Sequence, residues 1–206
     1  MDTNTTRRAL LLAAPALLLA TPALALTTAD QAMVDKAVAY LQGLPTARGR
    51  FVQTDPRGSV SQGLIYLQRP GRARFEYDAP SSLLVVSDGK VVSVADKRLK
   101  TVNRYFLSQT PLKLFLADEI RLDRGVTVSR VTKLNDGFEI TAQDRAGKTR
   151  GQIVLTFSDS PMQLIGWKIT DARNAVTQVR LTSLTRAGDL DPNLFRAPFP
   201  QQPTRR

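Results

Sequence analysis

Beyond residue 45 the chain alternates apolar and polar residues in short runs, and each run ends at a tight-turn sequence. A period of two places successive side chains on opposite faces of a strand, so that one face of each run can be buried. Short strands at intervals of roughly ten to twelve residues are typical of an antiparallel meander. The clearest turn sequences are Asp55-Pro56-Arg57-Gly58, Ser87-Asp88-Gly89, Asp136-Gly137, Ala146-Gly147 and Asp159-Ser160-Pro161.

These runs predict a mainly β (α+β) fold built on one curled sheet of about 10–11 strands. Because strand twist accumulates across a sheet of that width, we expect it to curl into an incomplete antiparallel β-barrel. The expected strands are Arg48–Thr54, Val60–Gln68, Arg72–Asp78, Leu83–Val86, Lys90–Ala95, Arg98–Val102, Val126–Leu134, Phe138–Gln143, Gln152–Phe157, Leu164–Thr170 and Val176–Leu184.

Two helices interrupt the strand pattern. Thr28–Leu44 has apolar residues at helical spacing, with Thr28 and Gln31 as an expected capping box and Pro45 just beyond its end. A short central helix is expected after Thr110-Pro111, with Thr110 as its N-cap and with Leu112, Phe115 and Leu116 as its apolar stripe. The open mouth of the curled sheet is a natural place to bury both apolar faces, which predicts a helical lid or plug over a hydrophobic cavity.

The N-terminus has the three regions of a secretory signal peptide. Arg7 and Arg8 precede an apolar run, and Ala23-Leu24-Ala25 has the form of a cleavage site. The run is too short to span a bilayer, and the adjacent arginines leave both the general secretory and the twin-arginine routes open. We therefore expect residues 1–25 to be removed, residues 26–199 to form a single periplasmic domain, and residues 200–206 to be a flexible tail.

The composition excludes much of enzyme chemistry. The chain contains no His and no Cys, which removes the common nucleophilic triads, imidazole bases and nearly all zinc and iron sites. No phosphate-binding loop of the GxxxxGK or GxGxxG type occurs. A carboxylate-pair hydrolase stays open as a catalytic alternative, although Glu76, Glu119 and Glu139 are the only glutamates and most aspartates adjoin turn-forming residues. We expect no enzyme activity, no cofactor and no metal.

The net charge of +11 favours anionic partners, and residues 66–80 combine three arginines with three aromatic side chains. Read as a strand, this stretch directs Phe75 and Tyr77 inward, where they cannot stack on bases, so no nucleic-acid partner is expected. Arg69 differs because it stands at the end of a strand. It is either a solvated arginine or a clamp whose five donors hold backbone carbonyls of a facing helix or loop. The outward residues Arg72, Arg74, Glu76 and Asp78 are expected to form a solvated, charge-paired face.

Several motifs, in order along the chain, resemble the LolA family of periplasmic outer-membrane lipoprotein carriers. The most specific is the run Arg69-Pro70-Gly71-Arg72-Ala73-Arg74-Phe75-Glu76-Tyr77 followed by Ser87-Asp88-Gly89-Lys90. Further matching positions are Phe51-Val52-Gln53, Gly63, Pro80, Leu84-Val85-Val86, Thr110-Pro111-Leu112 and Asp191-Pro192-Asn193-Leu194-Phe195.

This resemblance implies an incomplete barrel that is covered by helices and takes lipoprotein acyl chains into a hydrophobic cavity. It implies a monomer that receives outer-membrane lipoproteins from an inner-membrane ABC transporter and passes them to an outer-membrane acceptor lipoprotein or to the membrane itself. Arg69 matches the family arginine that holds the lid closed by hydrogen bonds to backbone. The residues expected to line the lipid site are Phe75, Tyr77, Leu84, Val86, Phe115, Leu116 and Trp167.

The chain also departs from the family pattern. Ala73, Ser93 and Ala95 stand where larger residues are common, and because little sequence follows Leu194-Phe195 we expect the extra terminal strand of some carriers to be absent. Two other functions therefore stay open on the same scaffold. One is a periplasmic domain that senses lipid or mislocalised lipoprotein, and the other is a carrier of a different amphiphile.

Overall fold

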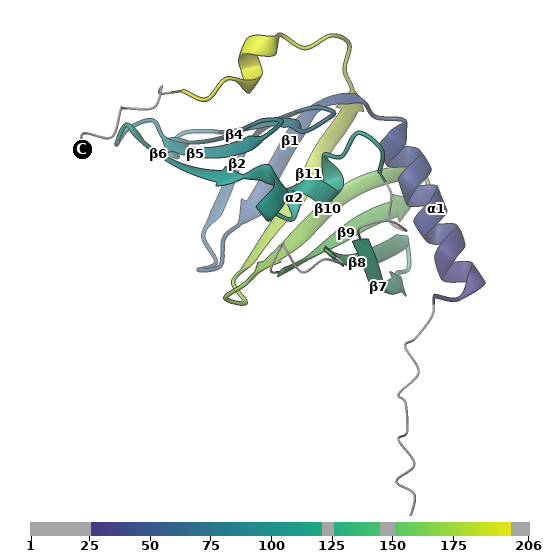
Figure 1. Cartoon of the computed structure of the whole chain (residues 1–206). Helices are drawn as coiled ribbons and strands as arrows, with labels where there is room; N and C mark the ends of the chain where they lie inside the picture. Colours follow the sequence, from purple (N-terminus) through teal and green to yellow (C-terminus); the bar gives the residue numbers. More distant parts are fainter. Residues whose placement is uncertain (1–25, 121–125, 145–150, 199–206) are drawn as a thin grey trace, which may run out of the picture.

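The computed structural model describes residues 26–120, 126–144 and 151–198, so the predicted signal peptide and the predicted tail from residue 200 lie outside the described residues. Its strands form one 11-stranded antiparallel sheet in the order β6-β5-β4-β3-β2-β1-β11-β10-β9-β8-β7 (Figure 1). The strands are β1 (Thr46–Thr54), β2 (Val60–Gln68), β3 (Arg72–Tyr77), β4 (Leu83–Asp88), β5 (Val91–Asp96), β6 (Thr101–Phe106), β7 (Val126–Lys133), β8 (Gly137–Asp144), β9 (Gly151–Asp159), β10 (Met162–Asp171) and β11 (Val176–Arg186).

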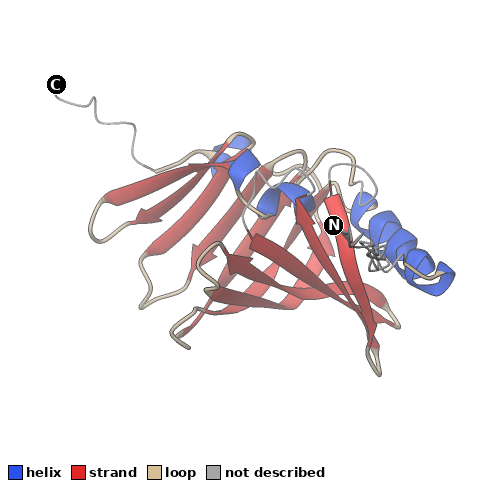
Figure 2. Cartoon of the chain, turned by 60° about the horizontal axis from the view of Figure 1, so that its bottom comes forward, coloured by secondary structure: helices blue, strands red, loops and turns tan. Residues whose placement is uncertain are grey.

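The topology is two meanders joined in the middle of the sheet. Strands β1 to β6 pair in chain order, as do strands β7 to β11, and β1 pairs with β11 to unite the two halves. The sheet curves strongly but does not close, because β6 and β7 are its two edges (Figure 2). The predicted incomplete antiparallel barrel is confirmed.

The expected limits of β6 were wrong. The strand begins at Thr101 rather than Arg98, because the carboxylate of Asp96 accepts hydrogen bonds from the backbone N–H groups of Arg98 and Leu99, at 2.8 and 2.9 Å. This side-chain cap folds residues 97–100 into a turn, which Lys100 completes with a φ of 53°.

The N-terminal helix α1 (Thr28–Gln42) begins at the residue expected as its cap and ends two residues before the expected Leu44. Thr27, not Thr28, is the N-cap: its hydroxyl accepts a hydrogen bond from the N–H of Asp30 at 3.1 Å, and the Asp30 carboxylate accepts one from the N–H of Thr27. An acidic residue thus replaces the expected Gln31 in the capping box. The buried face of α1 packs against β7 and β10.

The central helix α2 (Leu112–Phe115) follows the 3-10 helix η1 (Leu107–Gln109) and lies against the inner, concave side of the sheet (Figure 1). The helix was expected, but its cap was not. The Thr110 hydroxyl donates to the carbonyl of Leu107 at 3.0 Å and so closes η1, while Pro111 takes the N-cap position of α2.

The sheet buries apolar residues on both faces. The main core lies on the inner face and includes residues of α1, α2 and both halves of the sheet. A smaller cluster of Leu84, Val86 and Ala95 lies on the outer face. The short C-terminal helix η2 (Pro192–Phe195) contacts β3 and β4 on that side, so a segment distant in sequence covers the outer face there.

Candidate lipid-binding face and its helical cover

A row of aromatic rings crosses the inner face of the sheet. Phe51 of β1 meets Phe75 and Tyr77 of β3 edge to face, with ring centroids 5.5 and 5.1 Å apart. Phe75 in turn lies 6.1 Å from Trp167 of β10, and Trp167 lies 5.6 Å from Phe115 of α2. The row therefore joins both halves of the sheet to the helix that covers them, and its surface is suited to apolar chains.

Tyr77 carries a polar atom within this row. Its hydroxyl donates a hydrogen bond to Oε1 of Gln53 at 2.8 Å. Burial raises the pKa of Tyr77 to about 12, against a smaller opposite effect of the Gln53 hydrogen bond. The phenol is therefore neutral at physiological pH, and its hydrogen bond satisfies the buried oxygen.

Five of the seven residues expected to line the lipid site are buried together in the inner core: Phe75, Tyr77, Phe115, Leu116 and Trp167. Their contact with lipid stays a prediction.

The expectation that Leu84 and Val86 share this face was wrong. Phe75 pairs directly with Val85, whereas Leu84 and Val86 pair with Glu76 and Arg74 and so point to the outer face. A shift of one residue in the register of a strand turns each of its side chains to the opposite face of the sheet. Because β4 is a near-continuous apolar run, its sequence does not show which alternate residues face inward.

Arg69 lies just beyond β2, and its side chain reaches the helices that cover the inner face of the sheet. Its Nη1 donates a hydrogen bond to the backbone carbonyl of Leu41, in the last turn of α1. This carbonyl also accepts a hydrogen bond from the N–H of Leu44 at 3.1 Å. It lies at the negative end of the helix dipole, which attracts a guanidinium. The guanidinium carbon also lies 5.9 Å from the centroid of the Phe115 ring. The contact that the clamp hypothesis requires is thus present, while the clamp function stays a prediction.

The environment of Arg69 destabilises the charged form of its side chain. Burial lowers the pKa of Arg69 to about 10, and the nearby Tyr40 opposes this shift. Burial raises the pKa of Tyr40, so Tyr40 does not supply a full counter-charge. The Nε atom of Arg69 is buried and has no hydrogen-bond partner among the described residues. The contacts of such a group contribute only a modest net free energy, because the cost of desolvation offsets part of the gain.

Neutral hydrogen bonds reinforce the same junction. The N–H of Gly71 donates to the carbonyl of Leu116 at 2.7 Å, which ties the β2–β3 turn to the end of α2. The Gln42 side chain donates to the carbonyl of Asp118 at 3.2 Å and accepts from the N–H of Ile120 at 3.1 Å. The end of α1, the β2–β3 turn and the segment after α2 therefore meet at one place, which we call the Arg69 junction (Leu41, Gln42, Arg69, Gly71 and Leu116).

The sequence of the described residues agrees with a family assignment. The model of the family described as "Outer membrane lipoprotein carrier protein LolA" matches residues 42–198, which include every strand and the Arg69 junction except Leu41. The chain belongs to the LolA family. The resemblance seen in the sequence motifs is confirmed.

Individual relatives agree with this assignment. An outer-membrane lipoprotein carrier protein of Xylella fastidiosa (strain Temecula1) is 31% identical over 168 residues, or 77% of this chain and 80% of the relative. The protein of the same name from Pseudomonas syringae pv. syringae is 34% identical over 128 residues, or 58% and 56% of the two chains. The crystal structure of a LolA superfamily protein from Nitrosomonas europaea overlaps with a TM-score of 0.46 and 14% identity, covering 82% of this chain and 97% of that one.

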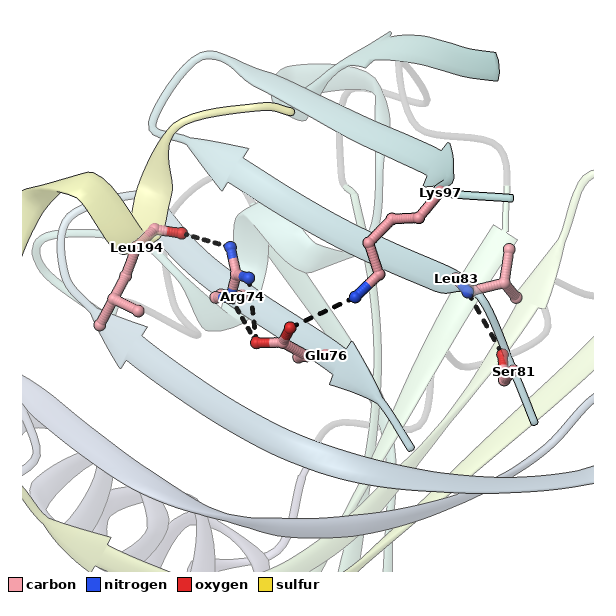
Figure 3. A network of polar contacts seen from close by, with 6 residues as sticks. All are labelled: Arg74, Glu76, Ser81, Leu83, Lys97 and Leu194. Carbon is pink, nitrogen blue, oxygen red and sulfur yellow. Dashed lines mark hydrogen bonds and ion pairs between the residues drawn. The ribbon is translucent and has the colours of Figure 1, made fainter. Parts of the chain in front are cut away.

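The outer face of this LolA-family chain carries a polar network around β3 (Figure 3). Arg74 donates to the carboxylate of Glu76 at 2.9 and 3.1 Å and to the carbonyl of Leu194 at 3.1 Å, and Lys97 contacts Glu76 at 3.4 Å. Burial alone would raise the pKa of Glu76, but the hydrogen bonds and charges of Arg74 and Lys97 outweigh it and lower that pKa. Arg74, Glu76 and Asp78 are charge-paired as expected, with Asp78 paired to Arg50. Arg72 was expected to share this pairing, but among the described residues its side chain bonds only to that of Gln68, at 3.3 Å.

The expected solvation of this face was wrong for Arg74. Its side chain is only 15% exposed, because η2 crosses it and supplies the Leu194 carbonyl. No sequence pattern near β3 indicates that a segment 120 residues away covers it.

The sequence analysis also missed residues that complete the inner face and the Arg69 junction. Phe51 and Gln53 belong to the period-two pattern of β1, so their inward direction was open to prediction. Tyr40 and Gln42 lie at the end of α1, and no local pattern marks their distant partners. Gln42 bonds to the segment after α2, whereas the Tyr40 ring meets that of Phe157 edge to face. Within residues 26–120, 126–144 and 151–198, no helix is long and apolar enough to cross a bilayer.

Proposed function

We propose that this protein is a periplasmic carrier that binds the acyl chains of lipoproteins between the inner face of its sheet and the cover, by which we mean α1 together with residues 107–120. It takes lipoproteins from the inner membrane and delivers them to the outer membrane, with no covalent chemistry. The observation that carries the proposal is an open sheet whose aromatic inner face is covered by helices tied at the Arg69 junction, in a chain of the LolA family.

The open edges of the sheet support this reading. A closed barrel could admit cargo only at its ends, whereas a sheet that ends at β6 and β7 can widen when the cover moves. The cover is held by a few hydrogen bonds and by the packing of Phe115 on Trp167. Acyl chains contribute about 0.8 kcal/mol per buried CH₂, so long chains can displace such contacts.

Release follows from the same balance. When the cover closes, it regains the Arg69 hydrogen bond and the aromatic contacts, and this gain is subtracted from the affinity for lipid. An unusually strong closed state would prevent loading, and an unusually weak one would prevent delivery. The buried, incompletely paired guanidinium gives an intermediate strength.

The proposal is tested by isolating the protein from the periplasm and identifying bound material by mass spectrometry. We expect diacylated or triacylated lipoproteins in stoichiometric amounts. Phe115→Ser removes a side chain that we expect to line the lipid site, and the loss of its contact with the acyl chains should lower the bound fraction severalfold. Val60→Ser, at a 67% exposed position remote from the cover, should not lower it. Free phospholipid, or no acyl material at all, would contradict the proposal.

A further inference from the structure

The edge strand β6 and the turn before it carry an unusual amount of exposed apolar surface. Leu99 is 56% exposed, Tyr105 53% and Phe106 62%. Large apolar side chains gathered on a sheet edge are unfavourable in water and point to a partner.

Basic residues accompany these side chains. Residues 88–106 contain five Lys and Arg and two Asp. Lys90, Arg98 and Lys100 are exposed, and Lys97 is ion-paired with Glu76. The Asp88 and Asp96 carboxylates accept hydrogen bonds from backbone N–H groups of their own turns. The local net charge of this edge is therefore positive.

The apolar and basic residues lie along one line. From Leu99 to Phe106 the edge extends about 20 Å at the usual rise per residue. Tyr105 pairs with inward-facing Val92 and Phe106 with Val91, so their side chains flank the edge on opposite sides. Lys90 lies at the Phe106 end, where its carbonyl accepts from the N–H of Leu107 at 2.8 Å. A flat surface that meets the sheet edge-on contacts both aromatic residues and the cations at each end.

We propose that this β6 edge surface (Lys90, Arg98, Leu99, Lys100, Tyr105 and Phe106) docks reversibly on a bilayer that contains anionic phospholipid. Aromatic side chains favour the membrane interface, and exposed cations are attracted by anionic headgroups. The apolar contact and the charge attraction together give stable but reversible attachment, whereas either contribution alone is too weak.

The inference rests on the proposed carrier function and adds where the carrier meets the membrane. The chain passes directly from Phe106 into η1 and α2, so docking at this edge brings the first part of the cover close to the bilayer. Cargo chains would then cross only a short distance between lipid and the inner face. The β6 edge and α1 lie at opposite sides of the sheet (Figure 1), so α1 stays away from the membrane when the β6 edge docks.

The test is flotation of the purified protein with vesicles of phosphatidylcholine alone and of equal parts phosphatidylcholine and phosphatidylglycerol. We expect binding only to the anionic vesicles, weakened by salt. The triple variant Lys90→Gln, Arg98→Gln, Lys100→Gln should lose affinity on the order of 100-fold, at roughly fivefold for each cation near an anionic surface. The matched control is Arg57→Gln, Lys133→Gln, Arg186→Gln, which removes three exposed cations elsewhere and should lose far less.

The apolar contribution is tested separately. Tyr105→Ser with Phe106→Ser should abolish flotation at moderate salt, whereas the exposed Val176→Ser should not. Equal loss in the two charge variants would show a non-specific charge effect and overturn the proposal. So would equal binding to neutral vesicles, or a Phe106-dependent dimer, seen by size-exclusion chromatography, with no binding to lipid.

Cargo analysis keeps this inference distinct from the proposed function. If the edge variants retain lipoprotein in the periplasm but transfer it slowly, both stand. If wild type carries lipoprotein but never binds vesicles, docking alone is refuted. If it binds anionic vesicles but carries no acyl chains, the carrier function alone is refuted.

Discussion

Replacing Arg69 with Leu tests how the cover is held. The variant loses the hydrogen bond to the Leu41 carbonyl and the contact with the Phe115 ring. A hydrogen bond from a charged donor contributes about 1.5–3 kcal/mol, and a partly buried cation–π contact contributes about 0.5–2 kcal/mol.

The loss is offset because Leu needs no partner. Relief of the buried, unpaired Nε returns about 1–3 kcal/mol, and the apolar Leu side chain packs on Phe115. The closed state should therefore lose a net of about 1–2 kcal/mol, which raises the equilibrium constant for opening about 5- to 30-fold.

Hydrogen exchange measures this change directly. The N–H groups of Gly71 and Ile120 bond to acceptors across the Arg69 junction, so they exchange only when the junction opens. Their exchange in the variant should accelerate about 5- to 30-fold. Amides in the centre of the β1–β2 ladder should not change. Trp167 is the only tryptophan, and it should become more accessible to a soluble quencher as Phe115 moves away.

Arg72→Leu is the matched control, because Arg72 is an exposed arginine whose side chain bonds only to Gln68 among the described residues. Exchange at Gly71 and Ile120 should stay at the wild-type rate in this control. If Arg69→Leu also leaves both rates within twofold of wild type, the clamp hypothesis is refuted.

Three further predictions concern stability. Because burial raises the pKa of Tyr77 to about 12, the folded state holds the phenolic proton more tightly than the unfolded chain, so about 2–3 kcal/mol of stability should be lost between pH 10 and 12. Urea unfolding across this range should show the loss in wild type and a smaller one in Tyr77→Phe. Gly71→Ala should lower the free energy of unfolding by about 2–4 kcal/mol in the same assay, since φ is +76° and a Cβ would lie 2.6 Å from the Cα of Gly89. The control is Gly58→Ala, at φ +84° with open space around it, which should cost about 1–2 kcal/mol. Equal costs would contradict the packing argument. Phe195→Ala should cost about 3 kcal/mol and speed proteolysis of the C-terminal segment, and an unchanged cleavage rate would show that Phe195 does not anchor η2.

The sequence by itself determined the elements that depend on neighbouring residues. The short apolar or alternating runs and the turns between them predict the eleven strands of the described residues, although the limits of β6 were wrong. In the alternating runs, the pattern reflects which side chains of one strand face the core. The same local rule correctly directs Phe75 and Tyr77 inward. Helix α1 was predicted from its apolar spacing, with an error of one residue at its cap, since two neighbouring threonines compete for that position.

Only the tertiary structure decided what depends on distant partners. The β1–β11 pairing that joins the two halves of the sheet links segments far apart in the chain, and no local pattern specifies it. The inward or outward direction of Leu84 follows from register with β3, because β4 is apolar on both faces. Arg69 meets the Leu41 carbonyl only once α1 has packed on the sheet, since these two residues belong to different elements and no local pattern brings them together.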